Sequence, residues 1–396
     1  MRVAIIGQGY VGLTIAVGAA GAGHEVVGFD LNADLVKALN SGVSHIEGIS
    51  NSALKSLLSN NTYTASTDAF SVNGCDVIVV AVPTPLTESR NPDLSYVHAA
   101  VELIQNNVKG PTLIINESTS YPGTLRKEIA ARIEGIQHLY ASSPERVDPG
   151  NTQWGTKNTP RLIGGLTPEA VAKAKEFYSS FCDTVIEVSS PEVAEAAKIF
   201  ENTFRQVNIA LVNEFAQIAD ALGISGREVL DAAATKPYGF MEFNPGPGVG
   251  GHCIPVDPTY LAYVANRAGV PATFIKRANE VNLAMPAYVV KRVIAGAGGS
   301  VKGKSVVVVG VSYKTNVADT RETPAASIID LLREAGATVC WNDPLVGSWR
   351  GETSTDLAGF DIAVVVTKHD VVKASDIAKS TYVFDCTGSI AGVDGI

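Results

Sequence analysis

The stretch RVAIIGQGYVG, residues 2–12, decides the fold of this chain. Residues 2–6 form a short apolar run of the kind that is buried on both faces of a parallel sheet. Gly7, Gly9 and Gly12 then separate this strand from a helix predicted over 13–22. Glycines in this pattern allow a tight turn, a close approach of backbone to a dinucleotide pyrophosphate, and close helix–sheet contact. The alternative is a glycine turn that serves packing alone.

Asp30 ends a second predicted strand over 25–29, 18 residues beyond Gly12. A carboxylate at this place accepts hydrogen bonds from both ribose hydroxyls of a dinucleotide and repels a 2′-phosphate. Strand, turn, helix and acid together predict a binding site for NAD rather than NADP.

Strands and helices alternate at both ends of the chain. After the first two strands, strand-sized runs follow at 62–65, 76–81, 112–116, 138–141, 161–164 and 184–188. Alternation of this kind predicts a parallel, doubly wound sheet. A second series has predicted strands at 305–310, 338–341, 362–366 and 383–385, with a helix over 324–335.

A helical segment lies between the two series. Ser189-Ser190-Pro191-Glu192 has the serine cap, early proline and early glutamate of a helix start. No breaker follows until Gly223, which predicts one helix of about 32 residues and roughly 48 Å. Further helices are predicted at 226–234 and from 258 to about 295, before the glycine-rich stretch 296–303. The fold class is therefore α/β, with two Rossmann-like doubly wound domains, 1–188 and 299–396, joined by a central helical domain, 189–298, with one long helix.

Composition excludes several classes of protein. The 396 residues carry 31 basic and 40 acidic side chains, a net charge of −9, and 46% of them are hydrophobic. An acidic balance without basic clusters argues against nucleic acid as the main partner. No apolar run approaches the ~20 residues of a membrane helix, so no membrane partner is expected. Five widely spaced cysteines without a CxxC pair indicate a reducing, cytoplasmic location without disulfides or a metal site.

Polar residues follow several of the predicted strands. Thr84, Ser118 and Thr119 lie in carboxyl-end loops, which border the ligand crevice of a doubly wound sheet. Their hydroxyl and backbone groups can contact a nicotinamide ribose or position a water, although ordinary turn chemistry also explains them. Glu145 and Arg146 follow the strand at 138–141, where they can hold a water and a substrate or form a surface ion pair.

Two further groups of residues can carry chemistry. Lys198 and Asn202 lie four residues apart, hence on one face of the long helix. That face is either solvated or borders a pocket in which a lysine takes part in acid–base chemistry. Lys314 and Arg321 follow the first strand of the last domain and either grip phosphates or are ordinary surface cations.

The segment from Gly246 to Asp257 is the most unusual of the chain. Its glycines bring backbone close to a neighbour and present Cys253 at their end. A nucleophilic cysteine needs such exposure, whereas most cysteines are inert small hydrophobes. His252 is a candidate base, with a structural histidine as the alternative.

Together these motifs resemble the UDP-glucose/GDP-mannose dehydrogenase family over essentially the whole length. The matching positions are Gly7–Gly12, Ser118-Thr119, Pro144-Glu145, Lys198, Asn202, Gly250-Gly251, Cys253, Lys314 and Arg321. Within the family, PERVDPG at 144–150, KPYGF at 236–240 and HCIPVDP at 252–258 look like the branch that oxidises UDP-N-acetylhexosamines. UDP-N-acetylglucosamine is the expected substrate, and UDP-N-acetylmannosamine, UDP-N-acetylgalactosamine and UDP-glucose are the alternatives.

The resemblance implies a four-electron oxidation of the sugar C6 alcohol with two NAD⁺ in succession. Cys253 would add to the intermediate aldehyde as a thiohemiacetal, which a second hydride transfer converts to a thioester for hydrolysis. Lys198 and Asn202 would stabilise the oxyanion, and Asp257, Thr119 and Glu145 would organise the water. The implied cofactor residues are Gly7, Gly9, Tyr10, Val11, Gly12, Asp30, Thr84, Ser118 and Thr119. The implied substrate residues are Glu145, Arg146, Lys198, Asn202, Gly250, Lys314 and Arg321.

Two positions depart from the UDP-glucose branch, which has a second glutamate where this chain has Pro149 and a lysine where it has Val256. Both departures argue against UDP-glucose. The resemblance also implies a homodimer or higher homo-oligomer built on the long helix, for which Val207, Ala210, Leu211 and Phe215 form a compatible apolar ladder. A two-electron hydroxyacid dehydrogenase explains the glycine turn and Lys198 but neither Cys253 nor the third domain. A non-catalytic sensor of NAD and nucleotide sugar leaves the whole set of catalytic candidates unexplained.

Overall fold

The computed structural model describes residues 1–46, 48–148, 150–151, 153–251 and 253–396. Pro149 and His252, for which the sequence raised questions of function, lie outside the described residues. The chain forms two compact units: residues 1–201 with 259–270, and residues 202–258 with 271–396. The division into three domains drawn from the sequence remains a prediction.

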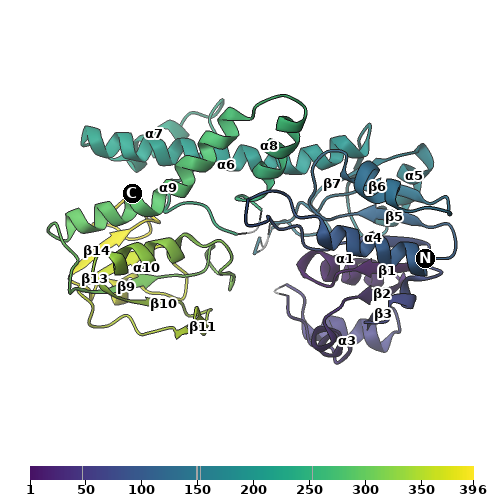
Figure 1. Ribbon diagram of the computed structural model, residues 1–396. Helices are drawn as coiled ribbons and strands as arrows, with labels where there is room; N and C mark the ends of the chain where they lie inside the picture. The colour runs from purple at the N-terminus through teal and green to yellow at the C-terminus, as the bar shows by residue number, and fades with distance from the viewer. Residues whose placement is uncertain (47, 149, 152, 252) are drawn as a thin grey trace. The chain divides into compact units, whose positions relative to one another are not determined.

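The first unit is built on one eight-stranded sheet (Figure 1). Its strands are β1 (Arg2–Ile6), β2 (Glu25–Phe29), β3 (Tyr63–Ser66), β4 (Val77–Val80), β5 (Leu113–Asn116), β6 (Leu139–Ser142), β7 (Arg161–Gly165) and β8 (Val185–Glu187). They lie in the order β3-β2-β1-β4-β5-β6-β7-β8. The pairs from β3 to β6 are parallel, as predicted, but β7 runs antiparallel to β6. No helix lies among the described residues between β6 and β7, and without a crossover the chain returns in the opposite direction.

Helices cover this sheet and complete its core. They are α1 (Tyr10–Gly21), α2 (Ala33–Asn40), α3 (Asn51–Ser59), α4 (Ser95–Asn107) and α5 (Pro168–Ser179), with the short helices η1 (Ala69–Val72), η2 (Leu125–Ile129) and η3 (Ala130–Arg132). Ile5, Leu13 and Phe177 join strand, α1 and α5 in one apolar cluster. The first helix begins directly after Gly9, three residues earlier than the predicted start. The glycine turn therefore ends at a helix N-terminus.

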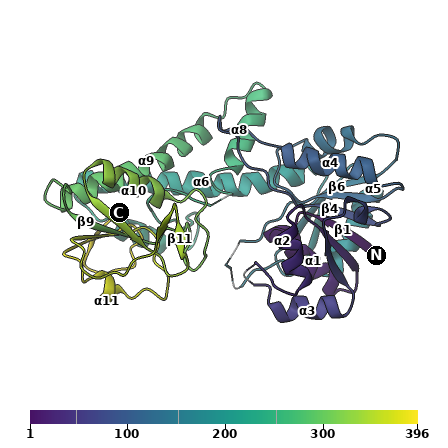
Figure 2. The same ribbon diagram turned by 60° about the horizontal axis from the view of Figure 1, so that its bottom comes forward.

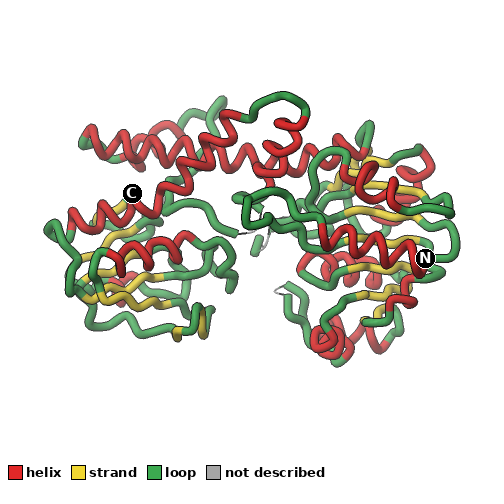
Figure 3. The backbone as a smooth tube through the Cα atoms, viewed as in Figure 1, coloured by secondary structure: helices red, strands yellow, loops and turns green. Residues whose placement is uncertain are grey.

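The long helix α6 (Pro191–Leu222) has 32 residues and begins at the predicted proline. Figure 3 colours the helices of the chain red. The sequence predicted helix from 258 to about 295, and the structure has two helices, α8 (Asp257–Arg267) and α9 (Thr273–Gly296). The break falls at Gly269, which has φ +79°, and at Pro271, which has no N–H to donate. Among the described residues, none of the helices combines the length and apolar character needed to cross a membrane.

The second unit contains a five-stranded parallel sheet in the order β10-β9-β13-β14-β15. Its elements are α7 (Gly226–Ala234), β9 (Ser305–Val309), α10 (Pro324–Glu334), β10 (Thr338–Asn342), the hairpin β11 (Ser348–Trp349) and β12 (Glu352–Thr353), β13 (Ile362–Val365), α11 (Ala374–Ile377), β14 (Tyr382–Asp385) and β15 (Asp394–Gly395). Val306 of β9 packs with Ile329 of α10, whereas Val307 packs with Ile377 of α11. The two helices thus cover opposite faces of this doubly wound sheet (Figure 2). Val289 and Val293 of α9 pack in the same core as Val306.

Candidate active site

The need for glycine differs among the three glycine positions of the first turn. Gly7 has φ +92°, and a Cβ there would lie 2.4 Å from the Ala81 carbonyl oxygen. A Cβ on Gly12 would lie 1.8 Å from the Gly7 carbonyl oxygen, so this position needs glycine for close packing. No described heavy atom lies within 4 Å of a Cβ built on Gly9. Packing therefore explains Gly7 and Gly12 but not Gly9, whose bare backbone fits the close approach of a pyrophosphate.

The helix after this turn also suits an anion. Gly9 is the N-cap of α1, and no side chain among the described residues caps it by a hydrogen bond. Tyr10 and Val11 follow as half-buried residues of the first turn, which contains no acidic side chain. The N–H groups and positive dipole end are the features that bind dinucleotide phosphates.

Asp30 is fixed beside the glycine turn. Its carboxylate accepts hydrogen bonds from the backbone N–H groups of Gln8, at 2.8 Å, and Asn32, at 2.9 Å. Two carboxylate oxygens offer about four lone pairs, so acceptor capacity remains for a ribose. Gln8 is itself buried and accepts from the Tyr63 hydroxyl at 2.9 Å. Sequence reasoning missed Gln8 and Tyr63, although a polar residue inside an apolar glycine turn is a usable signal.

The loops after β4 and β5 are joined by Ser118. Its hydroxyl oxygen accepts from the Val82 N–H at 2.9 Å, and its own N–H donates to the Val80 carbonyl at 3.2 Å. Thr84 is buried, and its carbonyl accepts from the Tyr260 hydroxyl at 3.1 Å. Thr119 follows Ser118 as a half-buried residue. The predicted cofactor residues thus lie at the carboxyl ends of β1, β2, β4 and β5.

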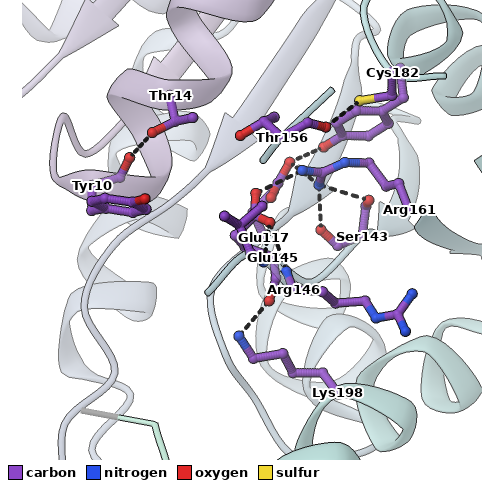
Figure 4. Close-up of polar contacts among 12 residues, drawn as sticks. Tyr10, Thr14, Glu117, Ser143, Glu145, Arg146, Thr156, Arg161, Cys182 and Lys198 are labelled. Carbon is purple, nitrogen blue, oxygen red and sulfur yellow. Dashed lines mark hydrogen bonds and ion pairs between the residues drawn. The ribbon is translucent and has the colours of Figure 1, made fainter. Parts of the chain in front are cut away.

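Arg161 is the centre of a buried ion cluster (Figure 4). Arg161 donates to Glu117 at 2.8 Å and to Glu145 at 2.7 Å, and the Tyr178 hydroxyl also donates to Glu117. Burial raises the pKa of Glu117 to about 7, although Arg161 opposes the shift. Burial also opposes ionisation of Glu145, but Arg161, the Val147 N–H and Lys198 hold its pKa below the ordinary value. No motif in the sequence indicated a role for Glu117, Arg161 or Tyr178.

Lys198 projects from α6 into this region rather than into solvent. The side chain is buried, and its ammonium group donates to the Glu145 carbonyl (Figure 4). The Glu145 carboxylate accepts from the N–H groups of Arg146 and Val147, so it is not part of a surface ion pair. Arg146 pairs with Glu201 of α6 at 2.5 Å. The solvated-face interpretation of Lys198 is therefore wrong.

Glu195 anchors α6 one turn before Lys198. Its buried carboxylate accepts from the N–H groups of Gly123 at 2.6 Å and Leu125 at 2.8 Å. Burial raises its pKa to about 7. These contacts fix the start of the long helix against the segment that follows Thr119.

Cys253, in the second unit, is exposed. Of the other cysteines, Cys75, Cys182 and Cys386 are buried in their units, and Cys340 is partly buried. The loop that carries Cys253 is held by two glycines. A Cβ on Gly250 would lie 2.7 Å from Tyr313 Cβ, and one on Gly251, with φ +83°, would lie 2.8 Å from Tyr313 Cε2. The Gly251 N–H donates to the Arg321 carbonyl at 2.9 Å.

Asp257 stands one helical turn after Cys253. Its N–H donates to the Cys253 carbonyl at 2.9 Å, and its carboxylate accepts from the Asn202 side-chain amide at 2.5 Å. Asp257 is 1% exposed and Asn202 is half-buried. The structure thus brings together two of the predicted catalytic side chains with the segment that bears the thiol.

The predicted phosphate-binding residues lie after β9. Arg321 is exposed and donates to Asp319 at 2.5 Å and 3.0 Å, and Lys314 is half-buried. Asp343 is buried beneath their loop and accepts from the N–H groups of Val311 and Ser312, both at 3.0 Å. Burial opposes its ionisation, but bonds from His369, Ser312 and Leu345 lower the pKa of Asp343 to about 2. Asp343 follows the second strand of its sheet, as Asp30 does in the first sheet. Its carboxylate, however, accepts hydrogen bonds from several groups of the protein.

The apolar ladder predicted on α6 is partly covered within the second unit and partly exposed. Val207 and Ala210 pack against Ala278 and Val281 of α9 within the second unit. Leu211 is 62% exposed and Phe215 is half-buried. Exposed apolar side chains instead recur along the helix at Phe204, Leu211, Ile218 and Leu222.

Three family models match the chain. They describe the NAD-binding domain, central domain and UDP-binding domain of the UDP-glucose/GDP-mannose dehydrogenase family, and they match residues 1–182, 192–284 and 307–391. A UDP-N-acetyl-D-mannosamine dehydrogenase of Methanococcus maripaludis is 37% identical, over 94% of this chain and 87% of the relative. A UDP-N-acetyl-D-glucosamine 6-dehydrogenase of Pseudomonas aeruginosa is 35% identical, over 88% and 84%. The solved structure of a UDP-D-ManNAc dehydrogenase from Pyrococcus horikoshii superposes with a TM-score of 0.90 at 32% identity, over 100% of this chain and 99% of that one.

Proposed function

The chain belongs to the UDP-glucose/GDP-mannose dehydrogenase family of NAD-dependent enzymes, and we propose that it oxidises UDP-N-acetyl-D-mannosamine at C6 to the uronic acid. The relative at 37% identity and the solved structure with a TM-score of 0.90 both bear the name of the mannosamine enzyme. The relative named for UDP-N-acetylglucosamine is 35% identical. These comparisons support the mannosamine substrate better than the glucosamine substrate expected from the sequence, and UDP-N-acetyl-D-glucosamine becomes the second candidate.

NAD⁺ bound at the Gly7–Gly12 turn would accept a hydride from the sugar C6 in each of two oxidations. The open backbone at Gly9 and the uncapped start of α1 support this place for the pyrophosphate. Asp30, Thr84, Ser118 and Thr119 lie at the same edge of the sheet and would contact the rest of the cofactor.

The exposed thiol of Cys253 is the observation that carries the proposal of a four-electron reaction. An aldehyde must become tetrahedral before it can lose a second hydride. The thiolate provides this by adding to the aldehyde carbon, while the carbonyl oxygen takes up a proton. Removal of the second hydride and of that proton leaves a thioester, and water then releases the carboxylate and the thiol.

The remaining side chains would hold charge and protons around this step. We propose that Lys198 and Asn202 stabilise the oxygen of the tetrahedral intermediate and that Asp257 fixes the Asn202 amide by its hydrogen bond. The Glu145 carboxylate already accepts from Arg161 and two backbone N–H groups, so its contribution would be to position Lys198 through its carbonyl. Thr119 and Asp257 would then organise the hydrolytic water.

Substrate binding and assembly complete the proposal. Gly250, Lys314 and Arg321 would bind the UDP moiety, which fits the match of residues 307–391 to a UDP-binding domain, and Arg146 would contact the sugar. We also propose a homodimer that covers the exposed apolar side chains of α6. We further propose that the chain divides into three domains, with boundaries at 188/189 and 298/299.

A substrate panel tests the proposed function. UDP-linked N-acetylmannosamine, N-acetylglucosamine, N-acetylgalactosamine and glucose are compared by NADH absorbance at equal enzyme concentration. We expect the highest kcat/KM for UDP-N-acetylmannosamine, by at least tenfold. A higher value for UDP-N-acetylglucosamine would transfer the proposal to that sugar, and no NADH from any of the four would overturn it.

A further inference from the structure

A single arginine joins two loops that the proposed function assigns to different ligands (Figure 4). One terminal nitrogen of Arg161 donates to Glu117, and the other donates to Glu145. Glu117 directly precedes Ser118 and Thr119, which are proposed to bind the cofactor. Glu145 directly precedes Arg146, which is proposed to bind the substrate. The three side chains are 7% exposed or less, so no solvent screens these pairs.

We propose that Arg161 is a positioning residue of the reaction, which holds the cofactor loop, residues 117–119, and the substrate loop, residues 145–147, in one fixed mutual geometry. The inference rests on the proposed function, because that function assigns the ligands of the two loops. Through the Glu145 carbonyl, the same arrangement fixes the ammonium group of Lys198.

Stability alone does not account for this cluster. Burying ions costs desolvation that their mutual attraction often fails to repay, and apolar side chains of similar volume frequently stabilise a protein as well or better. A guanidinium differs from apolar groups and from lysine because its rigid fork meets two carboxylates at defined angles. The Glu145 carboxylate in turn accepts from the N–H groups of Arg146 and Val147, which fixes the backbone of the substrate loop.

The topology explains why Arg161 reaches this place. Ser142 at the end of β6 pairs with Gly164 of β7, and the two strands are antiparallel. The first residue of β7, Arg161, therefore lies beyond the end of β6, at the edge of the sheet where β5 and β6 also end. If β7 ran parallel to β6, its first residue would instead lie beside the amino end of β6.

The protonation of Glu117 links this geometry to pH. The groups that face Glu117 are Arg161 from β7, Glu145 from the loop after β6, Tyr178 from α5 and Cys182 beyond α5. In the described part of the chain, Glu117 Oε2 has no hydrogen-bond partner, which suits a protonated carboxyl. Burial raises the pKa of Glu117 to about 7. Ionisation above that pH would draw Arg161 toward Glu117 and weaken its hold on Glu145.

The test uses the double variant E117Q/R161Q of the full-length enzyme. It removes the charge of Arg161 and any charge of Glu117 and keeps hydrogen-bonding groups, while the positive charge of Lys198 still favours the Glu145 carboxylate. We expect kcat to fall at least tenfold, the Kd of NADH to change less than threefold, and amide hydrogen exchange at 117–119 and 145–147 to become faster. In the single variant E117Q, we expect the ionisation near pH 7 to disappear from the pH profile of kcat/KM.

The matched control is R333Q/E352Q, which makes the same two substitutions at an exposed arginine–glutamate pair. Its kcat and exchange at both loops should equal those of the wild type. If E117Q/R161Q does not fold, R161K replaces it, because an ammonium group keeps the charge but lacks the rigid fork that holds the two carboxylates at defined angles. Wild-type kcat or unchanged exchange at both loops would overturn the inference. Failure of the proposed function shows separately, as a wild-type enzyme that oxidises no UDP-sugar while hydrogen exchange still reports on Arg161.

Discussion

Replacing Gly9 by alanine separates cofactor binding from folding. Gly9 has φ −68° and ψ −164°, which alanine adopts without strain, and no described heavy atom lies within 4 Å of the added Cβ. The folded protein should therefore keep its stability or gain up to about 1 kcal/mol, because alanine restricts the unfolded chain. A bound pyrophosphate, however, would meet the new methyl group at the backbone it needs to approach.

The expected loss of affinity follows from the hydrogen bonds that would be broken. A hydrogen bond to a charged group contributes about 1.5–3 kcal/mol, so the loss of one backbone N–H bond to phosphate costs about 2 kcal/mol. This corresponds to a rise of about thirtyfold in the Kd of NADH, measured by fluorescence titration. The melting temperature, measured by calorimetry, should not fall.

Two other glycines in α1 are matched controls. Gly21→Ala lies at the far end of the same helix, where a Cβ also has no described neighbour within 4 Å, so the Kd of NADH should not change. Gly12→Ala places its Cβ 1.8 Å from a carbonyl oxygen and should cost about 3 kcal/mol or more in stability. A Gly9→Ala enzyme with wild-type affinity for NADH would refute the assignment of this turn to the cofactor.

Three further predictions concern the second unit. Cys253→Ser should reduce acid formation from the UDP-sugar by about a hundredfold or more, because a hydroxyl is a far weaker nucleophile, and mass spectrometry of the products measures the acid directly; undiminished acid would remove the thioester. Gly251→Ala puts an alanine in a left-handed conformation, which costs about 1–2 kcal/mol, and places its Cβ 2.8 Å from Tyr313 Cε2, so kcat should fall at least tenfold. Gly246→Ala has room for its Cβ and should keep the wild-type kcat. Equal rates for the two variants would show that Gly251 does not hold the loop. Asp343 has a folded pKa near 2, below the ordinary 3.8, so its contribution of about 2 kcal/mol exists above about pH 4 and is lost as pH falls toward 2. Urea unfolding of Asp343→Asn should therefore show a stability deficit that shrinks over this range, and a deficit independent of pH would contradict the assignment.

Much of the fold could be predicted from local sequence. The apolar run of β1, the proline-marked start of α6 and the limits of α7 are set by residues within a few positions, so pattern and capping chemistry suffice. The direction of β7 could not be predicted in this way. Direction depends on whether the preceding connection contains a crossover helix, and the irregular stretch after β6 has no periodicity that reports its path.

The residues of the candidate site also differ in whether local sequence or distant contacts determine them. Gly9 and Cys253 could be predicted as site residues from residue type and spacing. In the structure, no described heavy atom lies within 4 Å of a Cβ built on Gly9, and Cys253 is exposed. Arg161 gave no such signal, since its carboxylate partners lie 44 and 16 residues away and meet it only because β7 is antiparallel. The packing of the ladder on α6 depends on distant contacts in the same way, because Val207 packs against α9 while Leu211 stays exposed, and the proposed interface itself stays a prediction.

The central claim is that one thiol carries the sugar through two successive oxidations, and the ratio of products measures it most directly. A limiting amount of UDP-N-acetylmannosamine is consumed completely with excess NAD⁺, and NADH is counted by absorbance while the sugar product is identified by mass spectrometry. The account predicts two NADH for each sugar and a uronic acid as the product. One NADH for each sugar, with free aldehyde accumulating, would contradict it.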